Sequence, residues 1–196
     1  MSVQDENNHI IYKCRKCGVI YRDDSIAHIC QGNCATGKHR LTIEEYGCLL
    51  SLIGKGRSED PHTRCSAVGI SDSKRILGIS YNGLKSGVKI PKWMYEEKNR
   101  IEKGEMMIHA EKNLFALIKK GDCNILCMNI SPCVNCGQTI AANDVREVVY
   151  IKEYHRCDKF KKLFKLHNIK YRELTKKEKQ NIKNYLIDMN NFSELE

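Results

Sequence analysis

The stretch from Asn124 to Glu153, NILCMNISPCVNCGQTIAANDVREVVYIKE, decides the fold of this chain. Short apolar runs over 124–130 and 147–153 predict two strands. Between them, Ser131 suits the N-cap of a helix and Pro132 suits its first position. A strand, a helix and a strand in this order predict a βαβ unit, with both strands parallel in one sheet.

The segments on either side continue this alternation. Upstream, residues 109–121 predict a helix that ends at Gly121. Downstream, residues 156–168 predict a helix, and a strand follows over 169–174. The residues of the downstream helix that are expected to face inward are Phe160, Leu163 and Phe164.

A hairpin precedes this series. Two short β-rich runs, over 64–71 and 75–82, flank the turn at 72–74. A hairpin followed by three helix–strand pairs predicts an α/β fold, a three-layer sandwich with a mixed five-strand sheet. Right-handed crossovers then place neighbouring helices on one face of the sheet.

The remaining segments connect or flank this domain. Its first helix is predicted to begin with a capping box of Thr42 and Glu45, and to end at Gly54 and Gly56. The apolar residues at helical spacing along it are Tyr46, Leu49, Leu50 and Ile53. A loop over 82–93 and a short charged helix over 94–104 follow the hairpin. The tail over 176–189 carries a stripe that is expected to dock, formed by Ile182, Tyr185, Leu186 and Met189.

The composition narrows the class of protein. The chain has 196 residues, of which 41% are hydrophobic, enough for one domain with a small appendage. No apolar run is long enough to span a membrane and no secretory signal opens the chain, so we expect a cytoplasmic protein without a membrane partner. The net charge of +9 favours anionic partners such as nucleotides or nucleic acid.

Eleven cysteines in a reducing compartment indicate metal ligands before disulfides. Four of them, Cys14, Cys17, Cys30 and Cys34, have zinc-finger spacing, and His28 and His39 compete for the last two ligand positions. We therefore expect a structural zinc in a finger-like module at 1–40, a main domain at 41–174 and a helical tail at 175–196. Cys48 and Cys65 fall in predicted core elements and are expected to be small hydrophobes.

A second zinc site is predicted in the main domain. Cys133 and Cys136 lie on one face of the first turn of a helix, where the helix dipole favours thiolates. His109 begins the preceding helix and is expected to reach them. Three protein ligands leave the fourth zinc position open, as in catalytic sites. The alternative is a structural zinc with a fourth cysteine, Cys127 or Cys157.

Glu111 distinguishes these two interpretations. Two thiolates cancel the zinc charge, so a nearby carboxylate must help to remove a proton from water. In the first turn of a helix, Glu111 can face the same cleft as His109. His109-Ala110-Glu111, followed by Pro132-Cys133-x-x-Cys136, matches the H-x-E…P-C-x-x-C pattern of zinc deaminases. A structural zinc would leave Glu111 unexplained.

With these motifs the chain resembles the cytidine deaminase superfamily and, within it, the deoxycytidylate (dCMP) deaminases. The resemblance covers about Thr42 to Leu174 and includes RSEDPHTRCSAVG, GISYNGLKSG, HAEKNLF, SPCVNC and EVVYIKEYH. It implies hydrolysis of dCMP to dUMP, which supplies dTMP synthesis, with one catalytic zinc and Glu111 as proton shuttle. It also implies a homo-oligomer with dCTP and dTTP as effectors. The chain departs from the family in Glu59, where a lysine is common, and in a loop that lacks the usual proline.

The resemblance also points to substrate contacts. Asn82 matches a sugar contact and Tyr154 an aromatic near the nucleotide. The full set of expected substrate contacts is Asn82, Ala110, Ser131, Tyr154 and Arg64. The candidate phosphate partners in loops are Arg57, Arg64, Lys85 and Lys89, and the sequence does not choose among them.

Two other functions compete with a dCMP deaminase. One is a deaminase of cytosine or adenine in RNA or single-stranded DNA, with the finger and the basic C-terminal region as binding surface. Aromatic residues that could stack on a flipped base make up only 7% of the chain, which disfavours it. The other is a non-enzymatic zinc protein that binds nucleic acid, and an intact Glu111 argues against it.

Overall fold

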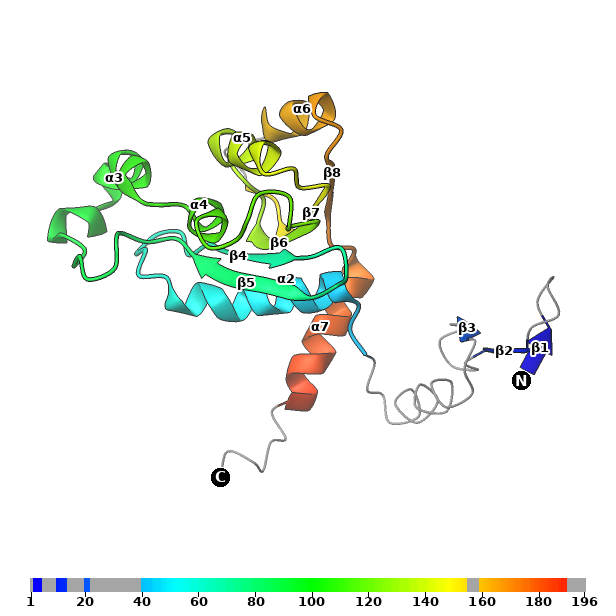
Figure 1. The fold of residues 1–196 in the computed structure, drawn as a ribbon. Coiled ribbons are helices and arrows are strands. Elements are labelled where there is room, and N and C mark those ends of the chain that lie inside the picture. Colours follow the sequence, from blue (N-terminus) through cyan, green and yellow to red (C-terminus); the bar gives the residue numbers. More distant parts are fainter. Residues whose placement is uncertain (1, 5–9, 14–19, 22–39, 155–158, 190–196) are drawn as a thin grey trace. The chain divides into compact units, whose positions relative to one another are not determined.

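The computed structural model describes residues 2–4, 10–13, 20–21, 40–154 and 159–189 (Figure 1). The chain divides into two compact units, one formed by Ile43–Lys179 and the other by Met1–Thr42 with Gln180–Glu196. In the latter, β1 (Ser2–Gln4), β2 (Ile10–Lys13) and β3 (Ile20–Tyr21) form an antiparallel sheet. The predicted ligands of the N-terminal zinc lie outside the described residues: Cys14, Cys17, Cys30, Cys34, His28 and His39.

The unit Ile43–Lys179 is built on a mixed five-stranded sheet with the order β5-β4-β6-β7-β8. Its strands are β4 (Ser66–Ile70), β5 (Ile76–Tyr81), β6 (Ile125–Ile130), β7 (Glu147–Lys152) and β8 (Lys170–Glu173). Strand β4 is antiparallel to β5 and β6, whereas β6, β7 and β8 are parallel. The predicted hairpin, βαβ unit and mixed sheet are confirmed.

Helices cover both faces of the sheet, as the three-layer prediction requires (Figure 1). On one face lies α2 (Ile43–Gly54), which the short 3-10 helix η1 (Lys55–Arg57) continues. On the other lie α4 (Ala110–Phe115), α5 (Val134–Ala142) and α6 (Lys159–Leu166). The first two of these helices lie side by side and carry the candidate metal ligands at their starts.

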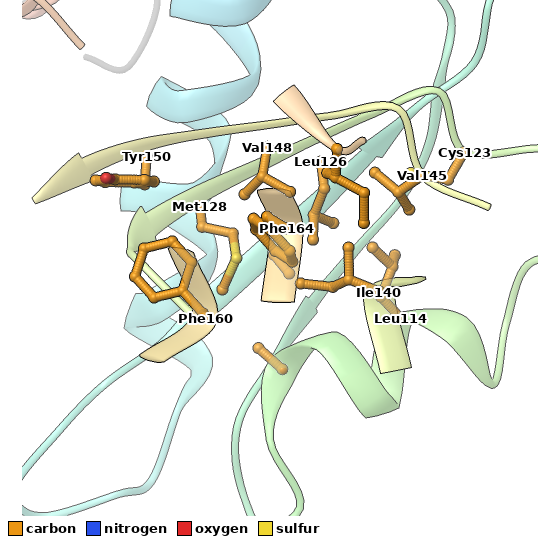
Figure 2. Close-up of a cluster of buried hydrophobic side chains, with 13 residues drawn as sticks. Leu114, Cys123, Leu126, Met128, Ile140, Val145, Val148, Tyr150, Phe160 and Phe164 are labelled. Carbon is orange, nitrogen blue, oxygen red and sulfur yellow. The ribbon is translucent and has the colours of Figure 1, made fainter. Parts of the chain in front are cut away.

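The main core lies between the sheet and these three helices (Figure 2). Leu126 and Met128 of β6 contribute to it, together with Leu114 of α4 and Ile140 of α5. The rings of Phe160 and Phe164 are fully buried and meet edge to face with centroids 5.4 Å apart, a favourable aromatic geometry. The predicted inward face of α6 is therefore confirmed, with Leu163 partly buried against the same cluster.

The residues that α2 buries are not all those that the apolar spacing in the sequence predicts. Of the apolar residues at helical spacing, Leu49 is buried, but Tyr46 is 40% exposed and Ile53 is 59% exposed. The small residues Gly47, Ser51 and Gly54 are buried instead. A Cβ on Gly47 would lie 2.7 Å from the Sγ of Cys127, so only a residue without a side chain fits there. Small residues let this helix approach the sheet closely. The buried face of α2 is therefore centred on these small residues and leaves Tyr46 and Ile53 exposed.

Two other predicted helices have different bounds. The helix predicted over 109–121 ends at Phe115, which lets Ile118 pack against the core while Leu117 is 73% exposed. The charged helix predicted over 94–104 is divided by turns into η2 (Lys92–Tyr95), η3 (Glu97–Asn99) and α3 (Arg100–Met106). Of these three short pieces, α3 lines the candidate site described below.

The C-terminal helix α7 spans Lys176–Met189, as the sequence predicts. Along its predicted stripe, Ile182 is buried, while Tyr185 and Leu186 are 38% and 37% exposed. No helix among the described residues has the length and apolar character needed to cross a membrane.

Candidate active site

The start of α4 is fixed to strand β5 by several hydrogen bonds. The Oγ of Ser80 donates to the carbonyl of Ala110 at 2.6 Å, and the Nδ2 of Asn113 donates to the carbonyl of Tyr81 at 2.8 Å. Gly83 and Ile108 exchange backbone hydrogen bonds just before the helix. His109, the N-cap residue of α4, therefore has a defined position at the edge of the sheet.

The start of α5 differs by two residues from the sequence prediction. Its N-cap is Cys133, whose Sγ accepts a hydrogen bond from the backbone N–H of Cys136 at 3.5 Å. Ser131 is not the N-cap, because its Oγ accepts from the backbone N–H of Tyr154 at 2.8 Å and joins the end of β6 to the segment after β7. Cys133 and Cys136 nevertheless share the first turn, as predicted.

His109, Cys133 and Cys136 form the candidate metal site. Their ligand atoms all lie within 4.8 Å of one another, and the Nδ1 of His109 is 3.1 Å from the Sγ of Cys136 and 3.6 Å from that of Cys133. The Nε2 of His109 faces the carbonyl of Gly104 at 3.4 Å. Donation of the Nε2 proton to that carbonyl leaves the Nδ1 lone pair directed at the sulfurs, as a metal ligand requires.

The charges in this cluster favour a cation among the three side chains. Hydrogen bonds from the Cys136 thiol and, when its Nδ1 carries a proton, from His109 stabilise the Cys133 thiolate and lower the pKa of Cys133 to about 4. The hydrogen bond to Cys133 raises the pKa of His109. One histidine nitrogen and two sulfurs are a ligand set typical of zinc, with room for one further ligand in a tetrahedron.

Cys127 is not part of this cluster. It lies on β6, where Leu126 and Met128 face α4, α5 and α6. Because side chains alternate along a strand, Cys127 faces α2, and its Sγ donates to the carbonyl of Glu44 at 3.7 Å. The other predicted fourth ligand, Cys157, lies outside the described residues.

Glu111 lies beside the cluster and is 3% exposed. His109 has extended backbone angles, φ −71° and ψ 153°, so the helical rotation does not separate it from Glu111. Both side chains line the same cavity. Burial raises the pKa of the Glu111 carboxyl, which makes it a better proton acceptor than an exposed glutamate.

The cavity over this cluster has a volume of about 280 Å³, which suits a small ligand. Its metal-side wall contains His109, Glu111 and Cys133, and its apolar wall contains Met107, Met128 and Ile130. The polar and remaining residues around it are Asp60, Thr63, Cys65, Asn82, Arg100, Ile101, Lys103, Gly104, Ser131 and Tyr154. A pocket with apolar walls and a few convergent polar groups is typical of a ligand site.

Asn82 holds one wall of the cavity together. Its Oδ1 accepts from the Oγ of Ser58 at 2.7 Å and from the backbone N–H of Cys65 at 2.7 Å. Its Nδ2 donates to the Oδ2 of Asp60 at 3.0 Å and to the carbonyl of Thr63 at 2.9 Å. These four hydrogen bonds define the orientation of the Asn82 amide and hold the segment 58–65 in place. Asn82 therefore stabilises the part of the cavity wall that this segment forms.

A buried ion pair joins this segment to α3. The Nζ of Lys103 lies 2.5 Å from the Oδ1 of Asp60, and the two side chains are 3% and 4% exposed. Asp60 also accepts from the backbone N–H groups of His62 and Thr63. Burial alone would raise the pKa of Asp60, but Lys103 and these donors outweigh it and hold that pKa below the ordinary value of 3.8.

Lys103→Met is therefore expected to lower the free energy of unfolding by about 3–5 kcal/mol, because it leaves a buried carboxylate without its cation. The pKa of Asp60 is lower in the folded protein than its ordinary value of 3.8. Ionised Asp60 therefore contributes its full stabilisation above pH 3.8, and this contribution is lost as the pH falls from 3.8 through the lower pKa of the folded protein. The difference in the free energy of unfolding between Lys103→Met and the original protein should therefore shrink over this acid range. Urea unfolding at several pH values measures that difference.

The control is Lys120→Met, which removes a lysine that is 66% exposed and pairs with an exposed aspartate. It should change stability little at any pH. Equal losses in both variants would show that the Asp60–Lys103 pair has no special role.

The expected substrate contacts separate into two groups. Asn82, Ser131 and Tyr154 line the cavity, whereas Ala110 is fully buried outside its lining and Arg64 is exposed outside it. Four further residues line this cavity that were not predicted from the sequence: Asp60, Thr63, Arg100 and Lys103. Asp60 and Thr63 lie in an irregular segment, Arg100 and Lys103 lie in α3, and no spacing in the sequence pairs the two segments.

Comparisons with known proteins agree with this geometry. Residues 44–152 match the family described as "Cytidine and deoxycytidylate deaminase zinc-binding region". Deoxycytidylate deaminase of Mus musculus is 26% identical over 156 residues, covering 74% of this chain and 86% of the relative. The Homo sapiens enzyme is 25% identical over 134 residues, 64% of this chain and 74% of the relative.

Solved structures show the same fold. The dCMP deaminase from the cyanophage S-TIM5 in apo form matches with a TM-score of 0.55 and 19% identity, over 69% of this chain and all of that one. The same phage enzyme in complex with dCMP and dUMP matches with a TM-score of 0.50 over 67% of this chain and 93% of that one, also at 19% identity. With the family match over more than half of its residues, the chain belongs to the cytidine and deoxycytidylate deaminase zinc-binding family.

Proposed function

We propose that this protein catalyses the zinc-dependent hydrolytic deamination of dCMP to dUMP. The observation that carries the proposal is the placement of the His109, Cys133 and Cys136 ligand atoms within 4.8 Å of one another, beside the buried carboxyl of Glu111 in one cavity. The names of the mouse and human relatives support dCMP as substrate. Zinc fits the ligand set and the family match.

His109, Cys133 and Cys136 would hold the metal in this proposal. A zinc ion bound there supplies Lewis acidity, which lowers the pKa of water. Glu111 accepts one proton from water and delivers it to the ring nitrogen next to the amino-bearing carbon. The water oxygen bonds to that carbon, the second water proton goes to the amino group, and the carbon–nitrogen bond breaks, so that dCMP and water yield dUMP and ammonia. Burial raises the pKa of Glu111 and so favours the protonated state in which it donates.

The surrounding residues have supporting roles. Met128 and Ile130 give the cavity an apolar wall against which a pyrimidine ring can pack. Ser131 orders the Tyr154 segment through its hydrogen bond, and Asn82 orders the segment 58–65. The proposal also includes the two contacts that the resemblance implies, between Asn82 and the sugar and between Tyr154 and the nucleotide.

Other parts of the proposal rest on the sequence and the resemblance. We propose a module at 1–40 with a second, structural zinc, a main domain at 41–174 and a tail at 175–196. We also propose that the protein is a homo-oligomer in the cytoplasm and is regulated by dCTP and dTTP. Metal analysis of the purified protein should give about two zinc ions per chain if both sites are filled.

The test of the substrate is a measurement of ammonia release from dCMP, deoxycytidine, cytidine and a cytidine-containing oligonucleotide. We expect turnover of dCMP with the highest kcat/KM among the four. Turnover of the oligonucleotide without turnover of dCMP would instead establish a polynucleotide deaminase. Zinc binding without turnover of any cytosine-containing compound would favour a non-enzymatic zinc protein.

A further inference from the structure

The cavity contains one cation that is held only loosely. Among its described lining residues, the permanently charged cations are Lys103 and Arg100. Lys103 is committed to Asp60 in a pair that is almost fully buried. Arg100 pairs instead with Glu97, whose side chain is 70% exposed, while the Arg100 side chain is 26% exposed.

The contacts of Arg100 leave it able to change partner. Its Nη1 donates to the Oε1 of Glu97 at 3.0 Å, and its Nη2 donates to the Oγ1 of Thr63 at 3.4 Å. A solvent-exposed ion pair contributes little stability, so an anion in the cavity can displace Glu97 at low cost. Glu97 keeps a second partner in that event, because its Oε2 lies 3.3 Å from the Nε2 of His62.

The geometry points to Arg100 as the residue that binds the 5′-phosphate of a nucleoside monophosphate in this cavity, with Thr63 beside it and Glu97 as the carboxylate that the phosphate displaces. A guanidinium matches phosphate with two parallel hydrogen bonds, and the Thr63 hydroxyl can donate a third. Arg100 and the Glu111–His109 pair line the same cavity. The inference rests on the proposed function, and it adds the basis for choosing a nucleotide over a nucleoside.

The basic residues suggested by the sequence fit this role less well. Arg57 lies with its guanidinium 5.9 Å from the centroid of the Tyr81 ring and is exposed. Arg64, Lys85 and Lys89 are exposed and do not line the cavity. Lys103 lines it, but recruitment of its ammonium would leave Asp60 buried without its cation.

The test compares dCMP with deoxycytidine in Arg100→Gln, Arg100→Lys and the original protein. Arg100→Gln should raise KM for dCMP by roughly 10- to 100-fold, because a charge-assisted contact to phosphate is lost. The kinetics with deoxycytidine should stay unchanged, because that substrate has no phosphate. Arg100→Lys should recover part of the affinity, since it retains the charge without the planar fork.

Two further variants make the test specific. Glu97→Gln should lower KM for dCMP by up to about fivefold, because the competing carboxylate is gone while Arg100 remains. Lys98→Gln removes a cation that is 77% exposed on the same short segment, and it should leave both substrates unaffected. A rise in KM for dCMP in Glu97→Gln, or equal effects of Arg100→Gln on both substrates, would overturn the inference.

A binding measurement separates this inference from the proposed function. Calorimetry with dUMP and deoxyuridine should show tighter binding of dUMP, and Arg100→Gln should remove that preference. If the protein turns over neither dCMP nor deoxycytidine, the proposed function fails, and the dUMP preference still decides the role of Arg100. If dCMP is turned over and the preference for dUMP survives Arg100→Gln, the phosphate is bound elsewhere and only the inference fails.

Discussion

Glu111→Gln is expected to reduce kcat for dCMP by about 10²–10⁴-fold while zinc content and folding are retained. Glutamine has nearly the same shape as glutamate, but its amide cannot accept and return a proton at neutral pH. The Glu111 side chain is 3% exposed beside the ligand cluster, so solvent has little access to replace it. Ammonia release under saturating dCMP, with zinc analysis of the same sample, measures both parts of the prediction.

The control for this variant is Glu105→Gln, which removes an exposed carboxylate from α3 outside the cavity lining. It should have the activity of the original protein. If Glu111→Gln keeps full activity with its zinc bound, Glu111 does not move the proton and the mechanism is wrong. Loss of zinc in Glu111→Gln would contradict the prediction in another way, because it would make Glu111 a metal ligand.

Cys136→Ser is expected to lose one zinc ion per chain and all measurable turnover. Cys136 is fully buried, its Sγ lies 3.1 Å from the Nδ1 of His109, and the candidate ligand group found among the described residues is His109, Cys133 and Cys136. A neutral serine hydroxyl is a far weaker zinc ligand than a thiolate. A metal that binds only the folded protein also stabilises it, so the melting temperature should fall.

The comparison variant is Cys123→Ser, which replaces a thiol that is 1% exposed in the main core and remote from the ligand set. It should keep its zinc and its activity in the folded fraction. Adding a chelator should lower the melting temperature of Cys123→Ser and of the original protein more than that of Cys136→Ser. Unchanged zinc content in Cys136→Ser would show that the metal is held by a different set of residues.

Much of the fold could be predicted because local patterns carry it. The apolar runs over 124–130 and 147–153 became β6 and β7, and the helix between them became α5, although it begins two residues later than predicted. The face of α2 was not predictable in this way. Hydrophobicity indicated that Tyr46 and Ile53 would be buried, but both are exposed. Small residues of α2 face the sheet instead, because the side chains of Cys127 and Ile70 leave no room for a Cβ at Gly47.

The candidate metal ligands could be predicted from the sequence, whereas the residues of the cavity wall could not. Two cysteines in one helical turn and a His-x-Glu pair have the spacing that zinc chemistry needs, so the sequence alone determined which side chains to bring together. Asp60 and Lys103, or Arg100 and Thr63, have no such spacing, because Asp60 and Thr63 lie in an irregular segment and their basic partners lie far along the chain in α3. Only the tertiary structure decided these pairs, since a contact between distant segments depends on how the whole sheet and its loops pack, and it is this wall that should select the substrate.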